Sequence, residues 1–142
     1  MNASSSGTAT APAAEAALHQ IGNVAERVGL SLRTVRYYEE VGLVVPEKRS
    51  AGGFRLYGEE QIERLRLITQ MKPLKFSLEQ MGDVLDALDQ LHAADTPPRQ
   101  REAATERLAE LGRYAEERCA KMRRQLRGGE ELVEHLGRES ST

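Results

Sequence analysis

The feature that most constrains the fold is a pair of short helical patterns that meet at a tight turn. The first pattern carries apolar residues at helical spacing, namely Ile21, Val24, Ala25 and Val28. Gly29 then ends it as a helix-capping glycine would, and Ser31 is a favourable N-cap for a second helix that closes at Gly42. A Gly-Leu-Ser connection between two short helices is typical of a helix-turn-helix, whose second helix usually enters the major groove of DNA.

A different pattern follows between residues 43 and 58. β-favouring residues stand on both sides of a Ser-Ala-Gly-Gly turn, which predicts a β-hairpin, or wing. Helical spacing resumes at Glu59, and Pro73 should end or bend that helix. Ser77 and Gln80 then form the pattern of a capping box, which predicts one more helix.

A long stretch without helix breakers runs from about Arg99 to Arg127. One apolar side chain per turn forms a stripe along it: Leu108, Leu111, Ala115, Cys119, Met122 and Leu126. A solitary helix would leave this stripe in water, and the chain has no second long helix to cover it, so we expect a homodimer through this helix. We expect Gly128-Gly129 to end the helix.

These patterns predict a mainly α fold: a winged helix-turn-helix with a small hairpin wing, followed by a long dimerisation helix. The expected organisation is a disordered tail over 1–17, a DNA-binding domain over 18–91, the dimerisation helix over 97–127 and a short tail over 128–142.

Composition adds two constraints. Residues 19–76 hold ten Lys or Arg against seven acids, whereas residues 77–142 hold ten against fourteen, so the basic balance lies in the N-terminal part. The single cysteine, Cys119, excludes an intrachain disulfide framework, and the first residues lack the pattern of a signal peptide. The cytoplasm is the compartment that fits, and no cofactor is predicted.

The second helix of the pair offers side chains that the core does not need. Because Val35 and Tyr38 occupy its inward positions, Arg33, Arg36 and Tyr37 project from another side. Arginine donors suit phosphates or guanine edges, and a tyrosine hydroxyl suits a phosphate. A solvated helix face with Arg–Glu pairs would explain the arginines alone. The wing favours DNA, because basic side chains flank its glycine turn: Lys48, Arg49 and Arg55.

The run IGNVAERVGLSLRTVRYYEEVGLVVPEKRSAGGFRLYGEEQIERLRLI resembles the N-terminal half of the MerR family of bacterial transcription regulators. Its most specific portions are RTVRYYEEVGL and RSAGGFRLY, and the resemblance covers roughly residues 20–91. It implies a winged-helix dimer with an antiparallel dimerisation helix, bound to a pseudo-palindromic promoter operator. Such regulators distort the promoter DNA so that RNA polymerase can engage.

The resemblance also implies roles for single residues. The DNA-binding set comprises Arg33, Thr34, Arg36, Tyr37, Arg49, Gly53, Arg55 and Lys72. Tyr57 is expected to pack the hairpin against the helices. Phe54 stands where many members of the family carry Tyr, so a hydroxyl contact from the wing is absent here. Lys75 replaces a common Gly before Phe76, and Pro73 precedes it. These two departures alter the expected geometry of the hinge between the DNA-binding part and the dimerisation helix.

No effector site is evident. Cys119 lies on the apolar stripe, where a small buried hydrophobe is the favoured interpretation over a metal ligand or a disulfide shared by two copies. The histidines are scattered: His19, His92 and His135. No metal site is predicted. Four apolar side chains allow two interpretations: Met71, Phe76, Met81 and Leu85. They are core residues, or they line a small-molecule site between residues 74–91 and the long helix of the partner.

Three function classes stay open at this point. The first is a sequence-specific transcription regulator, the second an architectural or recombination-accessory DNA-binding protein, and the third a protein-interaction adaptor. No His, Cys or paired-carboxylate constellation stands at catalytic spacing, so the sequence does not predict an enzyme.

Overall fold

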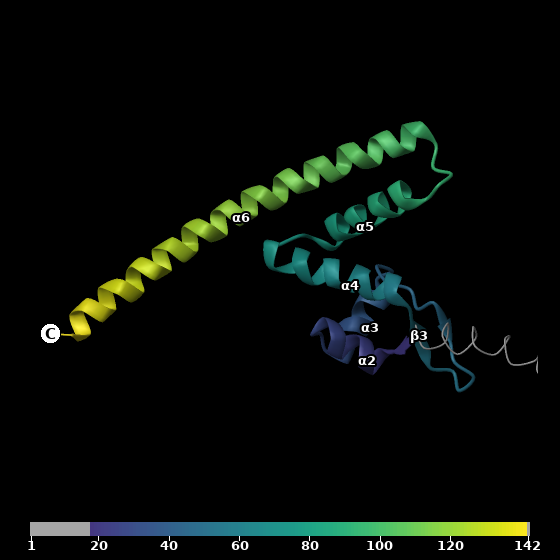
Figure 1. Cartoon of the computed structure of the whole chain (residues 1–142), viewed down its shortest axis with the longest axis horizontal. Helices are drawn as coiled ribbons and strands as arrows, with labels where there is room; N and C mark the ends of the chain where they lie inside the picture. The colour runs from purple at the N-terminus through teal and green to yellow at the C-terminus, as the bar shows by residue number, and fades with distance from the viewer. Residues whose placement is uncertain (1–17, 142) are drawn as a thin grey trace, which may run out of the picture. The chain divides into compact units, whose positions relative to one another are not determined.

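A computed structural model describes residues 18–141 (Figure 1). Its elements are β1 (His19–Gln20), α2 (Ile21–Val28), α3 (Leu32–Glu40), β2 (Lys48–Arg49), β3 (Arg55–Tyr57), α4 (Glu59–Met71), the 3-10 turn η2 (Lys72–Leu74), α5 (Leu78–His92) and α6 (Pro98–Ser140). The chain divides into two compact units after Gln70. The described residues before this point are the N-terminal unit, and those after it are the C-terminal unit. The predicted DNA-binding domain, 18–91, therefore takes in parts of both.

The two helices of the predicted helix-turn-helix are present with the expected caps. Gly29 adopts a left-handed conformation (φ 73°), and its N–H donates to the carbonyls that close α2. The Ser31 hydroxyl accepts a hydrogen bond of 3.1 Å from the N–H of Thr34 at the start of α3. Val24 and Val35 are fully buried between these helices and the rest of the unit. Local signals thus define both helices.

The wing belongs to a three-stranded antiparallel sheet with the order β1-β3-β2. The predicted hairpin is formed by β2 and β3, in the register Arg49↔Arg55. Its turn is closed by the N–H of Gly53, which donates to the carbonyl of Ser50 over 2.9 Å. The strand β1 was not predicted, because two residues carry no alternation and its partner, β3, is distant in sequence.

The core of the N-terminal unit forms along α4 and β3. Ile62, Leu65 and Ile68 are fully buried on one face of α4, and Tyr57 is fully buried as well, which confirms its expected packing role. The helix ends at Met71, just before the Pro73 turn, as predicted.

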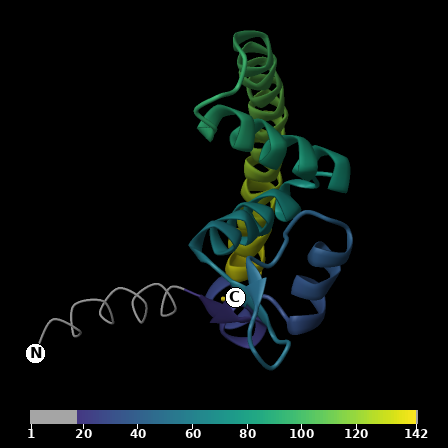
Figure 2. The ribbon, with the colours of Figure 1, turned by 90° about the vertical axis from the view of Figure 1, so that its right-hand side faces the viewer.

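The C-terminal unit is built on the packing of α5 against α6 (Figures 1 and 2). The predicted capping box of Ser77 and Gln80 starts α5. Five side chains of the two helices are buried: Met81, Leu85, Ala87, Ala104 and Leu111. Met71, Phe76, Met81 and Leu85 are all buried, so the four candidate pocket residues are core residues in this chain.

The predicted end of the long helix is wrong. α6 continues through Gly128 and Gly129 to Ser140, so residues 128–140 are helical and not a tail. A glycine ends a helix by taking a left-handed conformation, which neither residue does. An exposed helical glycine costs only about 1 kcal/mol relative to alanine, and the following Glu-Glu-Leu-Val-Glu run favours helix.

The predicted stripe on α6 is only partly free. Leu111 is buried, and Leu108, Ala115 and Cys119 are half-buried in the single chain, because the first half of α6 packs on α5 and η2. Only Met122 and Leu126 of the predicted stripe are exposed. The expectation that the whole stripe lacks cover was therefore wrong: α5 is long enough to cover its first half.

Two expectations concern the remaining regions. The predicted disordered tail over 1–17 lies outside the described residues. Within residues 18–141, no helix combines the length and apolar character needed to span a membrane.

Candidate nucleic-acid interface

The helix α3 presents its predicted contact residues to solvent. Its buried side chains are Val35 and Tyr38, and its exposed side chains include three of the predicted contact residues: Arg33, Arg36 and Tyr37. Within residues 18–141, neither Arg33 nor Arg36 forms a hydrogen bond or an ion pair, so both guanidinium groups keep their donors. The ring of Tyr37 lies 5.5 Å from that of Tyr38, and Tyr37 is 44% exposed. This face of α3 can donate to phosphates or base edges.

Thr34 stands apart from this exposed group. Its side chain is half-buried, and its hydroxyl lies 2.8 Å from the Ser31 hydroxyl within the cap of α3. The structure therefore places this predicted contact residue at the base of α3, with its hydroxyl already engaged.

The wing carries two further exposed cations, Lys48 and Arg49. The Nη1 of Arg49 donates to the carbonyl of Gly53 over 3.1 Å, so this side chain braces the turn that it flanks. Gly53 has a φ of 83°, a conformation that side-chain-bearing residues rarely adopt. Phe54 next to it is 62% exposed.

Arg55 is placed differently from the other predicted wing residue, Arg49. Its Nε donates to Oε1 of Glu39 on α3 over 2.7 Å, and the Glu39 side chain is only 16% exposed. The hydroxyl of buried Tyr57 donates to the other oxygen of the same carboxylate. Burial, and then the bond to Glu39, raise the pKa of Tyr57 well above its ordinary value, so this donor keeps its proton.

Glu39 was missed in the sequence. A usable signal was present, because Glu39 lies one helical turn after buried Val35 and next to buried Tyr38, on the inward side of α3. An acidic residue at such a position is expected to have a partner, since an unpaired buried charge is costly.

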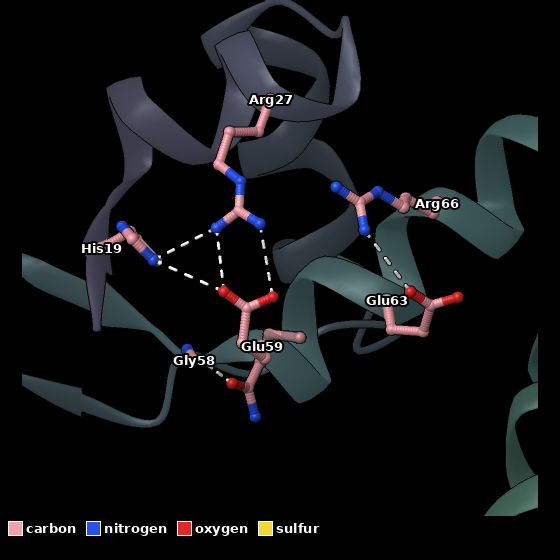
Figure 3. A network of polar contacts seen from close by, with 7 residues as sticks. His19, Arg27, Gly58, Glu59, Glu63 and Arg66 are labelled. Carbon is pink, nitrogen blue, oxygen red and sulfur yellow. Dashed lines mark hydrogen bonds and ion pairs between the residues drawn. The ribbon is translucent and has the colours of Figure 1, made fainter. Parts of the chain in front are cut away.

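A second polar network joins β1, α2 and the start of α4 (Figure 3). The two Nη atoms of Arg27 lie 2.9 and 3.3 Å from the carboxylate oxygens of Glu59, and Nε2 of His19 lies 3.1 Å from Arg27 Nη1. The hydrogen bond from Arg27 lowers the pKa of Glu59. Arg27 is therefore engaged within the N-terminal unit, unlike Arg33 and Arg36.

Lys72, the last of the predicted contact residues, is exposed at the first position of η2. It belongs to the C-terminal unit. The next residues include Lys75, which adopts a left-handed conformation (φ 66°) that residues other than glycine rarely take. The hydroxyl of Tyr114 on α6 donates to the Lys75 carbonyl over 3.2 Å, which holds this turn in place.

Metal-ligating residues do not gather in the described part of the chain. Residues 18–141 contain no group of three or more His, Cys, Asp or Glu side chains arranged to hold a metal ion. Cys119 is a free, half-buried thiol, and His92 and His135 are exposed.

Known proteins share both the sequence and the fold. A family model described as "MerR HTH family regulatory protein" matches residues 20–88, which span the helix-turn-helix, the wing, α4 and most of α5. The HTH-type transcriptional regulator CueR of Escherichia coli O157:H7 is 37% identical over 108 residues, which are 75% of this chain and 76% of that protein.

Solved structures agree with this assignment. A MerR family protein from Listeria monocytogenes matches with a TM-score of 0.63 and 26% identity, over 81% of this chain and 83% of its own. HiNmlR, "a MerR family regulator lacking the sensor domain, bound to promoter DNA", matches with a TM-score of 0.57 over 83% of this chain and 86% of its own. At 20% identity, this last likeness shows the fold alone.

Proposed function

The chain belongs to the MerR family of helix-turn-helix regulatory proteins and is a DNA-binding transcription regulator, and we propose that it binds a pseudo-palindromic promoter operator as a homodimer. One observation carries the proposal: α3 exposes two arginines that form no hydrogen bond or ion pair within residues 18–141, and the same unit carries a wing with two more exposed cations. This arrangement supplies base-reading and phosphate-binding donors from adjoining elements.

In the proposed complex, α3 enters the major groove and the wing follows the neighbouring backbone. Arg33 and Arg36 read guanine edges or bind phosphates, and Tyr37 donates its hydroxyl to a phosphate oxygen. The wing contributes Arg49 and the close backbone approach that Gly53 permits. The remaining proposed contacts are those of Thr34 near the start of α3, Arg55 on β3 and Lys72 in η2.

The distal half of α6 supports the homodimer. Beyond the part that α5 covers, the helix exposes Met122, Leu126, Leu132, Val133 and Leu136. A second copy that packs antiparallel along this helix would cover these side chains and fix the spacing of the two DNA-binding units. Dimer symmetry then requires an operator of two inverted half-sites.

The proposed action is on promoter geometry. The dimer distorts the operator so that RNA polymerase engages the promoter, which makes RNA polymerase the second macromolecular partner. We place the protein in the bacterial cytoplasm, where this DNA lies, and assign it no catalytic activity. The relatives described above are regulators by name and give no support to the architectural alternative.

Selection of bound duplexes from a random DNA pool tests the proposal. The full chain should enrich one inverted repeat and bind it with a Kd in roughly the nanomolar range at moderate salt. The double variant Arg33→Ala/Arg36→Ala should bind the selected site at least about a hundredfold more weakly, because each arginine contact is worth roughly 1–3 kcal/mol.

Arg66→Ala is the matched control for this experiment. Arg66 is an exposed arginine on α4, paired with Glu63 at 3.6 Å, and its removal takes away the charge of one arginine without touching α3 (Figure 3). The control should bind the selected site nearly as well as the wild-type chain. A wild-type chain that enriches no sequence would overturn the proposal.

A further inference from the structure

The wing forms too few strand pairs to fix its own orientation relative to α3. Its strands are two or three residues long, and each ladder pairs only two residues on a side. Hairpins of this size are marginally stable in water unless something packs against them. Contacts from the rest of the N-terminal unit must therefore set the angle between the wing and α3.

One carboxylate provides such a contact from the recognition helix itself. Glu39, in the last turn of α3, receives Arg55 Nε on one oxygen and the Tyr57 hydroxyl on the other. Both donors belong to β3, the central strand of the sheet. Since β2 pairs with β3, this carboxylate connects α3 to the strands that carry the wing turn.

We propose that Glu39 is a positioning residue for DNA binding, which holds the wing and Arg55 at the angle to α3 that a duplex requires. The inference rests on the proposed function and deepens it. Glu39 itself touches no DNA in this account. Its role is to make the cations of α3 and those of the wing act on one duplex at the same time.

The surroundings of Glu39 make it suited to this role. Its side chain is 16% exposed and that of Arg55 is 35% exposed, so water screens this ion pair less than it screens pairs on the open surface. The third partner, Tyr57, is fully buried and cannot move independently of the core. The bond to Glu39 uses Nε of Arg55, which leaves the two Nη groups of this guanidinium to face a phosphate.

Simple electrostatics and the proposed positioning role predict opposite effects of removing the Glu39 charge on DNA affinity. Glu39 is an acid on a helix that approaches DNA, so the removal of its charge would by itself strengthen binding to phosphates. If Glu39 positions the wing, its removal weakens binding instead. The neighbouring acid Glu40 is exposed at the end of the same helix and serves as the matched control.

The experiment compares Glu39→Gln, Glu40→Gln and the wild-type full chain. The Kd for the selected operator is measured over a range of salt concentrations, and amide hydrogen exchange of residues 48–57 is measured without DNA. We expect Glu39→Gln to raise the Kd about tenfold, which corresponds to about 1.4 kcal/mol, to flatten the salt dependence and to speed exchange in the wing. Glu40→Gln should bind as tightly as the wild type or slightly more tightly.

A further variant guards against loss of folding. Tyr57→Phe keeps the buried ring and removes one of the two donors to Glu39, so it should weaken operator binding by a smaller factor, about two- to fivefold. Operator binding by Glu39→Gln and Tyr57→Phe that equals wild-type binding would overturn the role of Glu39 and leave the proposed function intact. A wild-type chain without sequence preference would overturn the proposed function itself.

Discussion

The two units of this protein differ in where their exposed large apolar side chains lie. In the N-terminal unit, exposed large apolar residues are scattered over separate elements, such as Leu32 on α3 and Phe54 in the wing. In the C-terminal unit, five of them follow one another along the distal half of α6. The N-terminal unit therefore buries most of its apolar side chains within itself, whereas the C-terminal unit leaves a row of them uncovered along half of its longest helix.

Ion pairs distinguish the distal half of α6 from the rest of each unit. Glu39–Arg55 and Arg27–Glu59 join separate elements of the N-terminal unit, and Arg107–Asp83 joins the first half of α6 to α5. On the distal half of α6, the described ion pair Arg138–Glu134 links residues one turn apart on the same helix. Pairs of the first kind fix the relative placement of elements, and pairs of the second kind only support a helix.

The largest expected effect comes from charging the free face of α6. Leu126→Glu/Val133→Glu should leave the single chain folded, because these side chains are 62% and 71% exposed, but it should abolish the dimer. Operator affinity should then fall at least about a hundredfold, because two half-sites no longer bind as one unit. Analytical ultracentrifugation and a binding titration measure both quantities.

Gln125→Glu is the control for this variant, since it adds one negative charge beside Leu126 at a position that is already polar. It should remain dimeric. A dimer that survives the double substitution would show that the distal half of α6 is not the interface.

The next largest effect concerns the half of α6 that α5 covers. Leu85 on α5 is 1% exposed, so Leu85→Ala should lower the free energy of unfolding by about 2–5 kcal/mol through lost burial and a residual cavity. Val45→Ala, at a 66% exposed position, should change it by no more than about 0.5 kcal/mol. Denaturant unfolding measures both. Equal effects would mean that the α5–α6 contact is not a true core.

Substitution of alanine for Gly128 and for Gly53 should change the free energy of unfolding in opposite directions. A methyl group at Gly128 or at Gly53 would meet no atom within 4 Å, so backbone conformation alone decides the outcome. Gly128→Ala should raise the free energy of unfolding by up to about 1 kcal/mol, because its backbone is helical. Gly53→Ala should lower it by about 1–2 kcal/mol, because φ is 83° there. Thermal unfolding of the two variants distinguishes the signs, and destabilisation by Gly128→Ala would argue that α6 is not helical at this position.

The smallest expected effect is a pH dependence from the network of Figure 3. The pKa of Glu59 lies below its ordinary value because Arg27 donates to its carboxylate. The pair therefore stabilises the fold above the unfolded-state pKa of Glu59, and this contribution is lost as the pH falls through the lowered folded-state value. Glu59→Gln should flatten the decline in melting temperature between about pH 5 and pH 3, and Glu60→Gln should not. Identical declines in the two variants would argue against the pairing.

Local signals allowed much of the fold to be predicted. The end of α2 follows from Gly29, and the starts of α3 and α5 follow from the Ser31 hydroxyl and the Ser77–Gln80 box. The features that were missed depend on distant partners. The strand β1 exists only because β3 pairs with it, and the first half of the α6 stripe is covered only because α5 folds back along it.

In the candidate site, too, local patterns allowed some residues to be predicted, and a contact between distant residues was missed. Arg33, Arg36 and Tyr37 were recognised because helical geometry alone puts them on a different side from Val35 and Tyr38. The engagement of Arg55 with Glu39 could not be predicted from spacing, because it depends on how closely β3 approaches the end of α3.

Binding as a symmetric dimer can be tested by a hydroxyl-radical footprint of the full chain on its selected operator, together with the number of chains bound per duplex. We expect two protected half-sites related by two-fold symmetry, one helical turn of roughly 34–36 Å or a multiple apart, with two chains bound. One protected half-site occupied by a single chain would contradict it.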